Sequence, residues 1–219
     1  MSLNAKDAPG TCPRTPPLEP GTYPGHLVLV VDLGLQPGQI WQGVQKPPAN
    51  QLLLTYEFVD EFLLDEDGQE IKDKPRWLSE TMVLYNLEAE KAKSTLRYNV
   101  LDPNHVHKGD FSQLVGAPCN ITVVQNPKKG RVYENIAGIS AMRSKDVMKC
   151  PPLINKAMSF DLDVPNMEVF SSLPNWMQKK IVSNLEFKGS KLEGMLKVEE
   201  GFLEPIVVKD INETVETPF

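Results

Sequence analysis

The sequence has few cysteines and no long apolar run. Its three cysteines, Cys12, Cys119 and Cys150, are odd in number and widely spaced, so neither a disulfide framework nor a paired-cysteine zinc site is supported. No apolar stretch approaches the ~20 residues that cross a bilayer, and residues 1–20 lack the basic-then-apolar layout of a secretion signal. We therefore expect a protein of a reducing cytoplasm with no membrane partner.

Motifs of catalytic, nucleotide-binding and metal sites are also missing. The chain contains no dinucleotide or Walker loop, no nucleophile elbow and no zinc-protease motif. His105 and His107 have a spacing that can serve zinc on a strand, but they lie in a Gly/Pro/Asn loop with no cysteine near them in sequence. The segment 65–68 looks like part of a calcium loop, yet Leu63 and Lys74 stand at its first and last ligand positions. We expect no enzyme activity, no metal and no cofactor.

Positive net charge is absent as well, since the chain carries −6 overall. Most of that charge lies in the last 22 residues, which hold six acids and one lysine and so carry −5: Glu199, Glu200, Glu204, Asp210, Glu213, Glu216 and Lys209. The first 197 residues carry −1. A nearly neutral body of this kind can hold a local basic groove, so the overall sign does not exclude a nucleic-acid ligand.

What the sequence does contain is a regular series of strand-like segments. Alternation and turn signals predict five strands, over residues 21–33, 51–59, 76–85, 118–126 and 131–140. A helix capped by Asn86 is predicted over 86–98, and Asp110 is predicted to cap a short helical turn. This order predicts a mainly β protein with a five-stranded OB-type barrel, in which a helix separates strands three and four. A different small barrel is the alternative.

Outside the predicted barrel, three segments have a different composition. Residues 1–20 are polar and rich in proline, which indicates a flexible N-terminal arm. Residues 144–200 contain a linker and a helix that begins at Pro174, whose apolar side is expected to pack on the barrel or on a partner copy. A second short helix is possible over 187–200, and residues 201–219 form an acidic tail expected to be disordered. The barrel domain then spans residues 21–143.

Six basic side chains are candidates for contacts with phosphate groups. In an OB barrel, the loop between strands one and two and the hairpin between strands four and five flank the nucleic-acid groove. Cations there neutralise phosphates, and the affinity falls as salt rises. A solvated hairpin tip or helix face is the competing interpretation, and it is favoured for the two helical residues. The candidates are Lys128, Lys129 and Arg131 on the hairpin, Lys46 on the first loop, and Lys93 and Arg97 on the helix.

Five aromatic side chains are candidates for stacking against bases, which requires no particular sequence and is worth ~1–3 kcal/mol per base. Trp41 lies in the first long loop, Trp77 on strand three and Tyr133 on strand five. Tyr56 and Phe58 share one face of strand two with leucines, so for this pair a place in the core is favoured.

The end of the chain combines acids with a terminal aromatic residue. Asp210, Glu213 and Glu216 precede Pro218 and Phe219, whose own carboxylate is free. Such an end can dock Phe219 in an apolar pocket while the acids meet a basic rim. An ordinary frayed terminus is the alternative.

This tail resembles the C-terminal tails of bacterial and phage single-stranded DNA-binding proteins, which are acidic, close in phenylalanine and recruit replication and recombination enzymes. It departs from them in having no run of aspartates. Over roughly residues 20–190 the chain is also similar to a phage family of OB-fold proteins described as binding single-stranded DNA. The similarity lies in four sequence segments: Pro20-Gly21-Thr22-Tyr23-Pro24-Gly25, Tyr56-Glu57-Phe58-Val59-Asp60-Glu61-Phe62, Asp73-Lys74-Pro75-Arg76-Trp77 and Val115-Gly116-Ala117-Pro118-Cys119.

The resemblance implies sequence-independent binding of single-stranded DNA by residues 21–143, in phage replication or recombination. It also implies the cytoplasm of the infected bacterial host, recruitment of partner enzymes by the tail, and a monomer or homodimer. Two other functions stay open. One is a virion or assembly protein that self-associates through its barrel and its 173–186 helix. The other is an adaptor or inhibitor that mimics DNA with its acidic segments 60–70 and 199–216.

Overall fold

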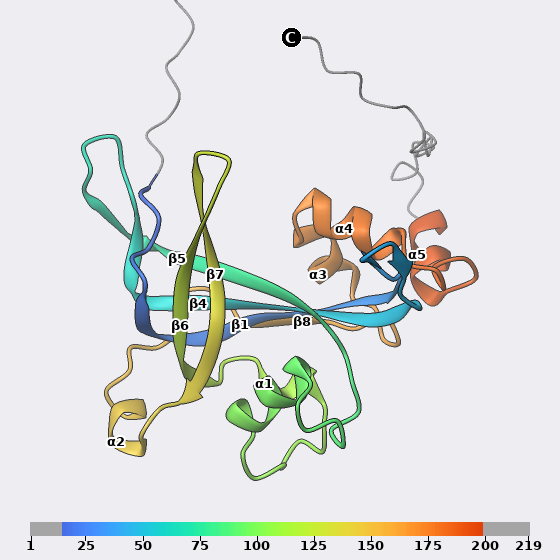
Figure 1. Ribbon diagram of the computed structural model, residues 1–219, viewed down its shortest axis with the longest axis horizontal. Helices are drawn as coiled ribbons and strands as arrows, with labels where there is room; N and C mark the ends of the chain where they lie inside the picture. Colours follow the sequence, from blue (N-terminus) through green and yellow to red (C-terminus); the bar gives the residue numbers. More distant parts are fainter. Residues whose placement is uncertain (1–14, 199–219) are drawn as a thin grey trace, which may run out of the picture.

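The computed structural model describes residues 15–198, apart from the side chains of Trp41 and Val198. Five long strands make up most of the structure (Figure 1): β1 (Gly21–Gln36), β4 (Ala49–Leu64), β5 (Glu70–Val83), β6 (Pro118–Lys128) and β7 (Arg131–Ala141). Shorter elements connect or cover them: β2 (Ile40–Trp41), β3 (Val44–Gln45), α1 (Lys93–Leu101), the 3-10 helix η2 (Phe111–Leu114), α2 (Ser144–Val147), β8 (Met158–Phe160), α3 (Met167–Ser172), α4 (Asn175–Val182) and α5 (Lys191–Val198). The prediction of a mainly β protein is confirmed.

The middle helix is shorter than predicted. Asn86 accepts a hydrogen bond from Glu88 N at 3.0 Å, and successive tight turns occupy residues 86–92, so α1 begins at Lys93. Short polar side chains favour such local turns over a helix when they can bond to a nearby backbone N–H. Asp110 does cap η2, as predicted, by accepting from Ser112 N at 2.8 Å.

The long strands form one open sheet in the order β5-β4-β1-β6-β7, in which every neighbour is antiparallel. The central strand β1 pairs with β6 over Gly21–His26, and farther along, over Leu29–Val31, it pairs in parallel with β8. Within residues 15–198, no backbone ladder joins the two outer strands β5 and β7. A hydrogen-bonded closed barrel is therefore not formed.

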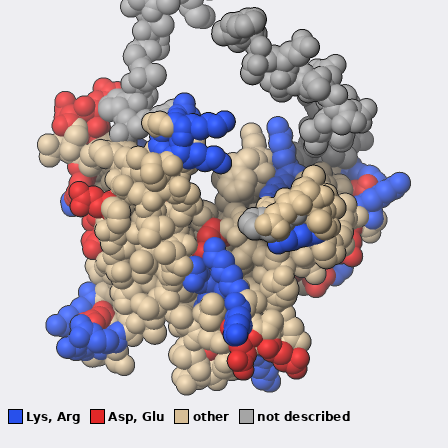
Figure 2. Space-filling view, viewed as in Figure 1, with Lys and Arg blue, Asp and Glu red and all other residues tan. Residues whose placement is uncertain are grey.

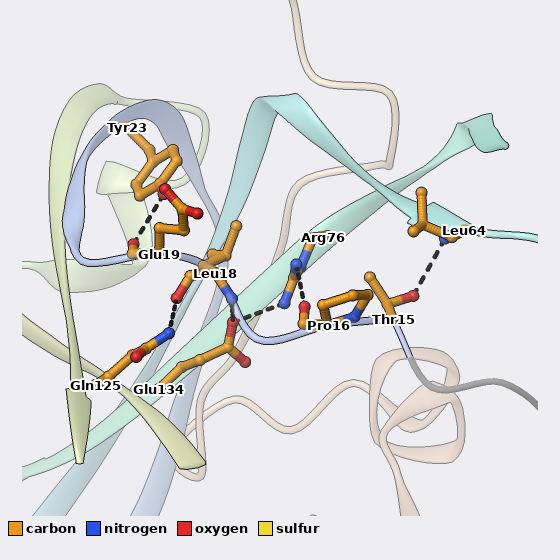
Figure 3. A network of polar contacts seen from close by, with 9 residues as sticks. All are labelled: Thr15, Pro16, Leu18, Glu19, Tyr23, Leu64, Arg76, Gln125 and Glu134. Atoms are coloured by element: carbon orange, nitrogen blue, oxygen red, sulfur yellow. Dashed lines mark hydrogen bonds and ion pairs between the residues drawn. The ribbon is translucent and has the colours of Figure 1, made fainter. Parts of the chain in front are cut away.

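Side chains and the N-terminal segment bridge the gap between β5 and β7 instead (Figure 3). Arg76 on β5 forms an ion pair of 2.6 Å with Glu134 on β7. The same carboxylate accepts from Leu18 N, while Arg76 Nη1 donates to Pro16 O at 2.8 Å. Gln125 Nε2 donates to Leu18 O at 2.9 Å, and the Leu18 side chain is buried in the core. Residues 15–18 are thus bound to the sheet, and the prediction of a flexible arm over residues 1–20 is wrong for this segment.

Replacing Glu134 by alanine is expected to loosen this bridge. The substitution removes the shared acceptor of Leu18 N and Arg76, and a partly buried donor left unpaired costs about 1–3 kcal/mol. We expect a lower free energy of unfolding in urea and faster amide exchange at Leu18. Glu19→Ala, which changes an exposed carboxylate in the same segment, is the control. Unchanged exchange at Leu18 in Glu134→Ala would contradict the bridge.

Strand β1 carries two hydrophobic cores, one on each face. The barrel core contains Leu27 and Val30 with the inner side chains of β4, β6 and α1. The second core contains Val28, Leu29 and Val31, packed against β8 and the helices α3, α4 and α5. A register irregularity between Leu27 and Leu29 accounts for the departure from simple alternation. The run from Leu27 to Val31 is therefore buried on both faces of the sheet.

The helices α3, α4 and α5 lie together at one end of the sheet, and the β4–β5 and β6–β7 hairpins lie at the other (Figure 1). The C-terminal helix was expected to pack on the barrel or on a partner copy; Met177 and Ile181 of α4 pack on the far ends of β1 and β4. A space-filling view shows the outline notched between the β6–β7 hairpin and the helices (Figure 2). Among the helices of residues 15–198, none has the length and apolar character to cross a bilayer.

Candidate nucleic-acid interface

The tip of the β6–β7 hairpin presents three cations to solvent. Lys128 and Arg131 pair across the hairpin, and Lys129 and Gly130 form its two-residue turn with φ values of 50° and 72°. Positive φ at both central residues is the geometry of a type I′ turn, whose twist matches that of the strands. All three cationic side chains are exposed, and none has an ion-pair partner in the described part of the chain. The tip is therefore a compact positive site.

Tyr133 lies beside these cations on the same hairpin. It pairs with Asn126 across the ladder and is 49% exposed. Together with Asn135, Lys128 and Lys129 these residues line a shallow hollow of about 480 Å³. A ring with an open face thus lies close to charged groups, as base stacking next to phosphate contacts requires.

Trp77 lies on β5 and is held in one orientation. Its Nε1 donates to Glu57 Oε2 at 3.0 Å, while the residue stays 43% exposed. Glu57 is buried and also accepts from Ile154 N and from Asn155 Nδ2, both at 2.7 Å. The indole is therefore fixed by its N–H edge and still offers surface to a ligand.

Trp77 and Tyr133 flank the same gap in the sheet. Their chain neighbours Arg76 and Glu134 are the ion pair that bridges β5 and β7. Successive side chains of a strand point to opposite faces. Arg76 and Glu134 point toward the inside of the sheet, so the adjacent residues Trp77 and Tyr133 point outward. The ion pair thus places two exposed rings on the two outer strands, one on each side of the gap.

The outer face of β5 continues from Trp77 as an exposed stripe. Ser79 and Thr81 follow at a period of two and are exposed, and Tyr85, two residues beyond the end of β5, is 54% exposed. Sequence reasoning did not select Tyr85, although the alternation that begins at Trp77 would have placed it on the same face. Two aromatic residues therefore mark the two ends of this stripe.

The far end of the stripe opens into a cavity of about 370 Å³. Its lining combines the loop after β1 with the end of β5 and one residue of α4, and includes Lys46, Gln51, Thr81, Tyr85 and Lys180. Lys46, predicted as a phosphate contact, is therefore at the edge of the same face. Trp41 lies in β2, and its side chain falls outside the described part.

Two of the five stacking candidates lie in the core, the position that the sequence favoured for this pair. Tyr56 and Phe58 are fully buried in the barrel core, on the inner face of β4. The exposed stripe of β5 lies on the opposite face of the sheet. The Tyr56 hydroxyl donates to Glu80 Oε1 at 3.1 Å, and the Phe58 ring meets Tyr23 edge-on at 5.7 Å. Their place in the core leaves no ring surface for a base.

Arg97 is wrong as a phosphate contact, because it is 5% exposed and paired with Glu80. Its Nε and Nη2 donate to the two carboxylate oxygens at 2.7 and 3.0 Å, and Lys93 Nζ adds an ion pair of 2.8 Å. Burial alone would raise the pKa of Glu80, but hydrogen bonds from Arg97 and Lys93 outweigh it and lower the pKa. Arg97 and Lys93 thus tie α1 to β5 rather than meeting a ligand.

The tail candidates Asp210, Glu213, Glu216, Pro218 and Phe219 lie outside the described residues. No protein-family model matches the chain, and no curated protein sequence matches it. The interface is therefore argued from its own geometry.

Proposed function

We propose that this chain is a non-catalytic protein that binds single-stranded DNA without sequence preference. The observation that carries the proposal is that three cations without ion-pair partners among residues 15–198 share a hairpin with the exposed Tyr133, across the β5–β7 gap from the exposed Trp77, whose indole is held by Glu57. The sheet order and the position of α1 between β5 and β6 support an OB-type barrel of the partly open kind. Phosphates would lie on Lys128, Lys129 and Arg131, with bases stacked on Trp77 and Tyr133.

Single strands are favoured over duplex because the aromatic faces need unpaired bases. The hydrogen bond from Trp77 to Glu57 holds the indole in place before DNA arrives, which lowers the entropy lost on binding. In Figure 2 one group of acidic side chains lies on the β4–β5 hairpin and others lie in the lower part of the view, while the tip of the β6–β7 hairpin is basic. A role in phage replication or recombination, in the host cytoplasm and with enzymes recruited by the tail, belongs to the same proposal.

A titration of fluorescein-labelled oligo-dT followed by anisotropy tests this function. We expect binding to the single strand, weaker binding to a duplex of equal length, and an affinity that falls as salt rises. Trp77→Ala is expected to weaken binding by about 1–3 kcal/mol through lost stacking. Trp77→Phe keeps a ring without the N–H donor and serves as the control, so it should retain most of the affinity.

Equal affinity for the two forms, or no binding at low salt, would refute the proposal. In that case, detection of the protein in purified phage particles would support a virion or assembly protein. Binding to a DNA-handling enzyme without binding to DNA would instead support an adaptor that mimics DNA.

A further inference from the structure

Helix α4 presents an aromatic residue and two lysines on its solvent side. Trp176 is 53% exposed, while Met177 and Ile181 of the same helix are buried in the second core. Lys179 and Lys180 follow Trp176 by three and four residues, so the three side chains lie on adjacent parts of one helix face. Neither lysine has an ion-pair partner among residues 15–198.

The helix is attached firmly to the sheet. Gln36 Nε2 at the end of β1 donates to Lys180 O at 3.0 Å, and Leu185 N donates to Leu35 O at 2.8 Å. These bonds fasten both the last turn of α4 and the residues after it to β1. The exposed face of α4 is therefore presented on a rigid support, as a binding site needs.

Lys180 also lines the cavity at the far end of β5. Among the described residues, the lining contains no acid: Pro37, Gly38, Gln39, Lys46, Pro47, Ala49, Gln51, Thr81, Met82, Val83, Tyr85 and Lys180. The loop that forms one wall is tight, since a Cβ at Gly38 would lie 1.8 Å from the Lys46 carbonyl oxygen. Partial burial lowers the pKa of Lys180, and an incoming anion would offset that cost.

We propose that α4 and this cavity form a second anchor for the same single strand, outside the barrel's own hairpin. Lys179 and Lys180 hold phosphates there, while Trp176 and Tyr85 stack on bases. The inference rests on the proposed function and extends the binding surface to the C-terminal helices.

The spacing of the two anchors sets the length of DNA that reaches both. Trp77 and Tyr85 are eight residues apart in the chain, and because β5 ends at Val83 their separation is at most roughly 26 Å at ~3.3 Å per extended residue. A stacked strand that repeats every ~3.4 Å covers this distance with about eight nucleotides. Oligonucleotides shorter than this reach one anchor, and longer ones gain affinity by engaging both.

The test measures the affinity of the full chain and of Lys179→Glu/Lys180→Glu for dT4 and dT16 at 0.1 M salt. Two lost phosphate contacts are expected to weaken dT16 binding roughly 25-fold, at about 0.7 decade per contact, and to lower the salt slope by about 1.4. Binding of dT4 is expected to change less than about twofold, because the hairpin is intact. Lys145→Glu/Lys149→Glu, on α2 and just after it, makes the same change of net charge and should leave dT16 affinity unchanged.

Three outcomes overturn this inference. If dT16 binds both proteins equally, or if dT4 and dT16 weaken by the same factor, α4 is not a second anchor, while the hairpin site stands. If the unaltered protein binds no single strand, the proposed function fails with it. If Trp176→Ala turns a dimer into a monomer in sedimentation without changing dT16 affinity, this face joins two copies of the chain. Circular dichroism of each variant confirms folding, since the substituted side chains contribute little to the core.

Discussion

Reversing the charges of Lys128, Lys129 and Arg131 together is expected to lower the affinity for single-stranded DNA about 100-fold at 0.1 M salt. The three side chains are exposed and unpaired within residues 15–198, so their full charge is available to phosphates. Each phosphate contact with a single strand contributes about 0.7 to the slope of log affinity against log salt, and three contacts contribute about two decades at 0.1 M. Anisotropy of labelled oligo-dT, repeated at several salt concentrations, measures both the affinity and the slope.

The matched control reverses the charges of three other cations, Arg143, Lys145 and Lys149, around α2. It changes the net charge by the same amount at a different place on the molecule. If both triple variants lose the same affinity, the effect comes from overall charge and the hairpin is not a specific site. If the hairpin variant keeps both affinity and slope, the phosphates bind elsewhere. Melting temperatures of the hairpin variant should stay close to those of the unaltered protein, because these side chains contact no core residue.

Replacing Glu80 by glutamine is expected to lower the free energy of unfolding by about 3–5 kcal/mol, the largest effect on stability that we expect. Glu80 lies in the barrel with Arg97, Lys93 and the Tyr56 hydroxyl on its two oxygens. Removing its charge leaves the Arg97 guanidinium buried without a counter-ion, which costs far more than a surface pair. Urea denaturation measures the change, and Glu88→Gln, at an exposed site near α1, is the control.

A double variant separates the charge from the packing. Glu80→Met with Arg97→Met removes both buried charges and fills the space with apolar atoms, and such replacements are often neutral or stabilising. We expect it to recover most of the stability that Glu80→Gln loses. If the single and double variants are equally destabilised, the loss comes from side-chain shape rather than from an uncompensated charge.

The ion pair between Glu80 and Arg97 also makes the free energy of unfolding depend on pH, and the sign follows from the pKa of Glu80. The pKa of Glu80 is lowered in the folded state, so the unfolded chain binds its proton more tightly. The stabilisation is present above the unfolded pKa and is lost as the pH falls through the folded pKa. We expect the difference in stability between the unaltered protein and Glu80→Gln to shrink in acid.

The local features of the fold were predictable because short-range backbone sterics decide them. Alternation placed the five long strands, and the Lys129-Gly130 turn placed the basic hairpin tip. The candidates on the hairpin tip and Trp77 are exposed, as a contact with a ligand requires. Asp110 as a cap followed from a side chain that bonds to its own neighbouring backbone.

Other features depend on contacts between residues far apart in the chain. The leucines beside Tyr56 and Phe58 favoured a core position for this pair, but only the packing of β4 against the other elements of the core showed that both rings are fully covered. Arg97 looked like a helix-surface cation because its partner Glu80 lies on another element. Lys180 and Tyr85 line the same cavity because α4 packs near the end of β5. No local sequence pattern relates these two residues.

The sequence by itself determined the strands, their order along the chain and the charged hairpin, since each depends on residues a few positions apart. The tertiary structure alone decided which aromatic and basic side chains remain available to a ligand. Burial and ion pairing depend on what packs against a residue. For Trp77, Glu57, Arg76 and Glu134 those partners come from β4, β5, β7 and the chain after α2.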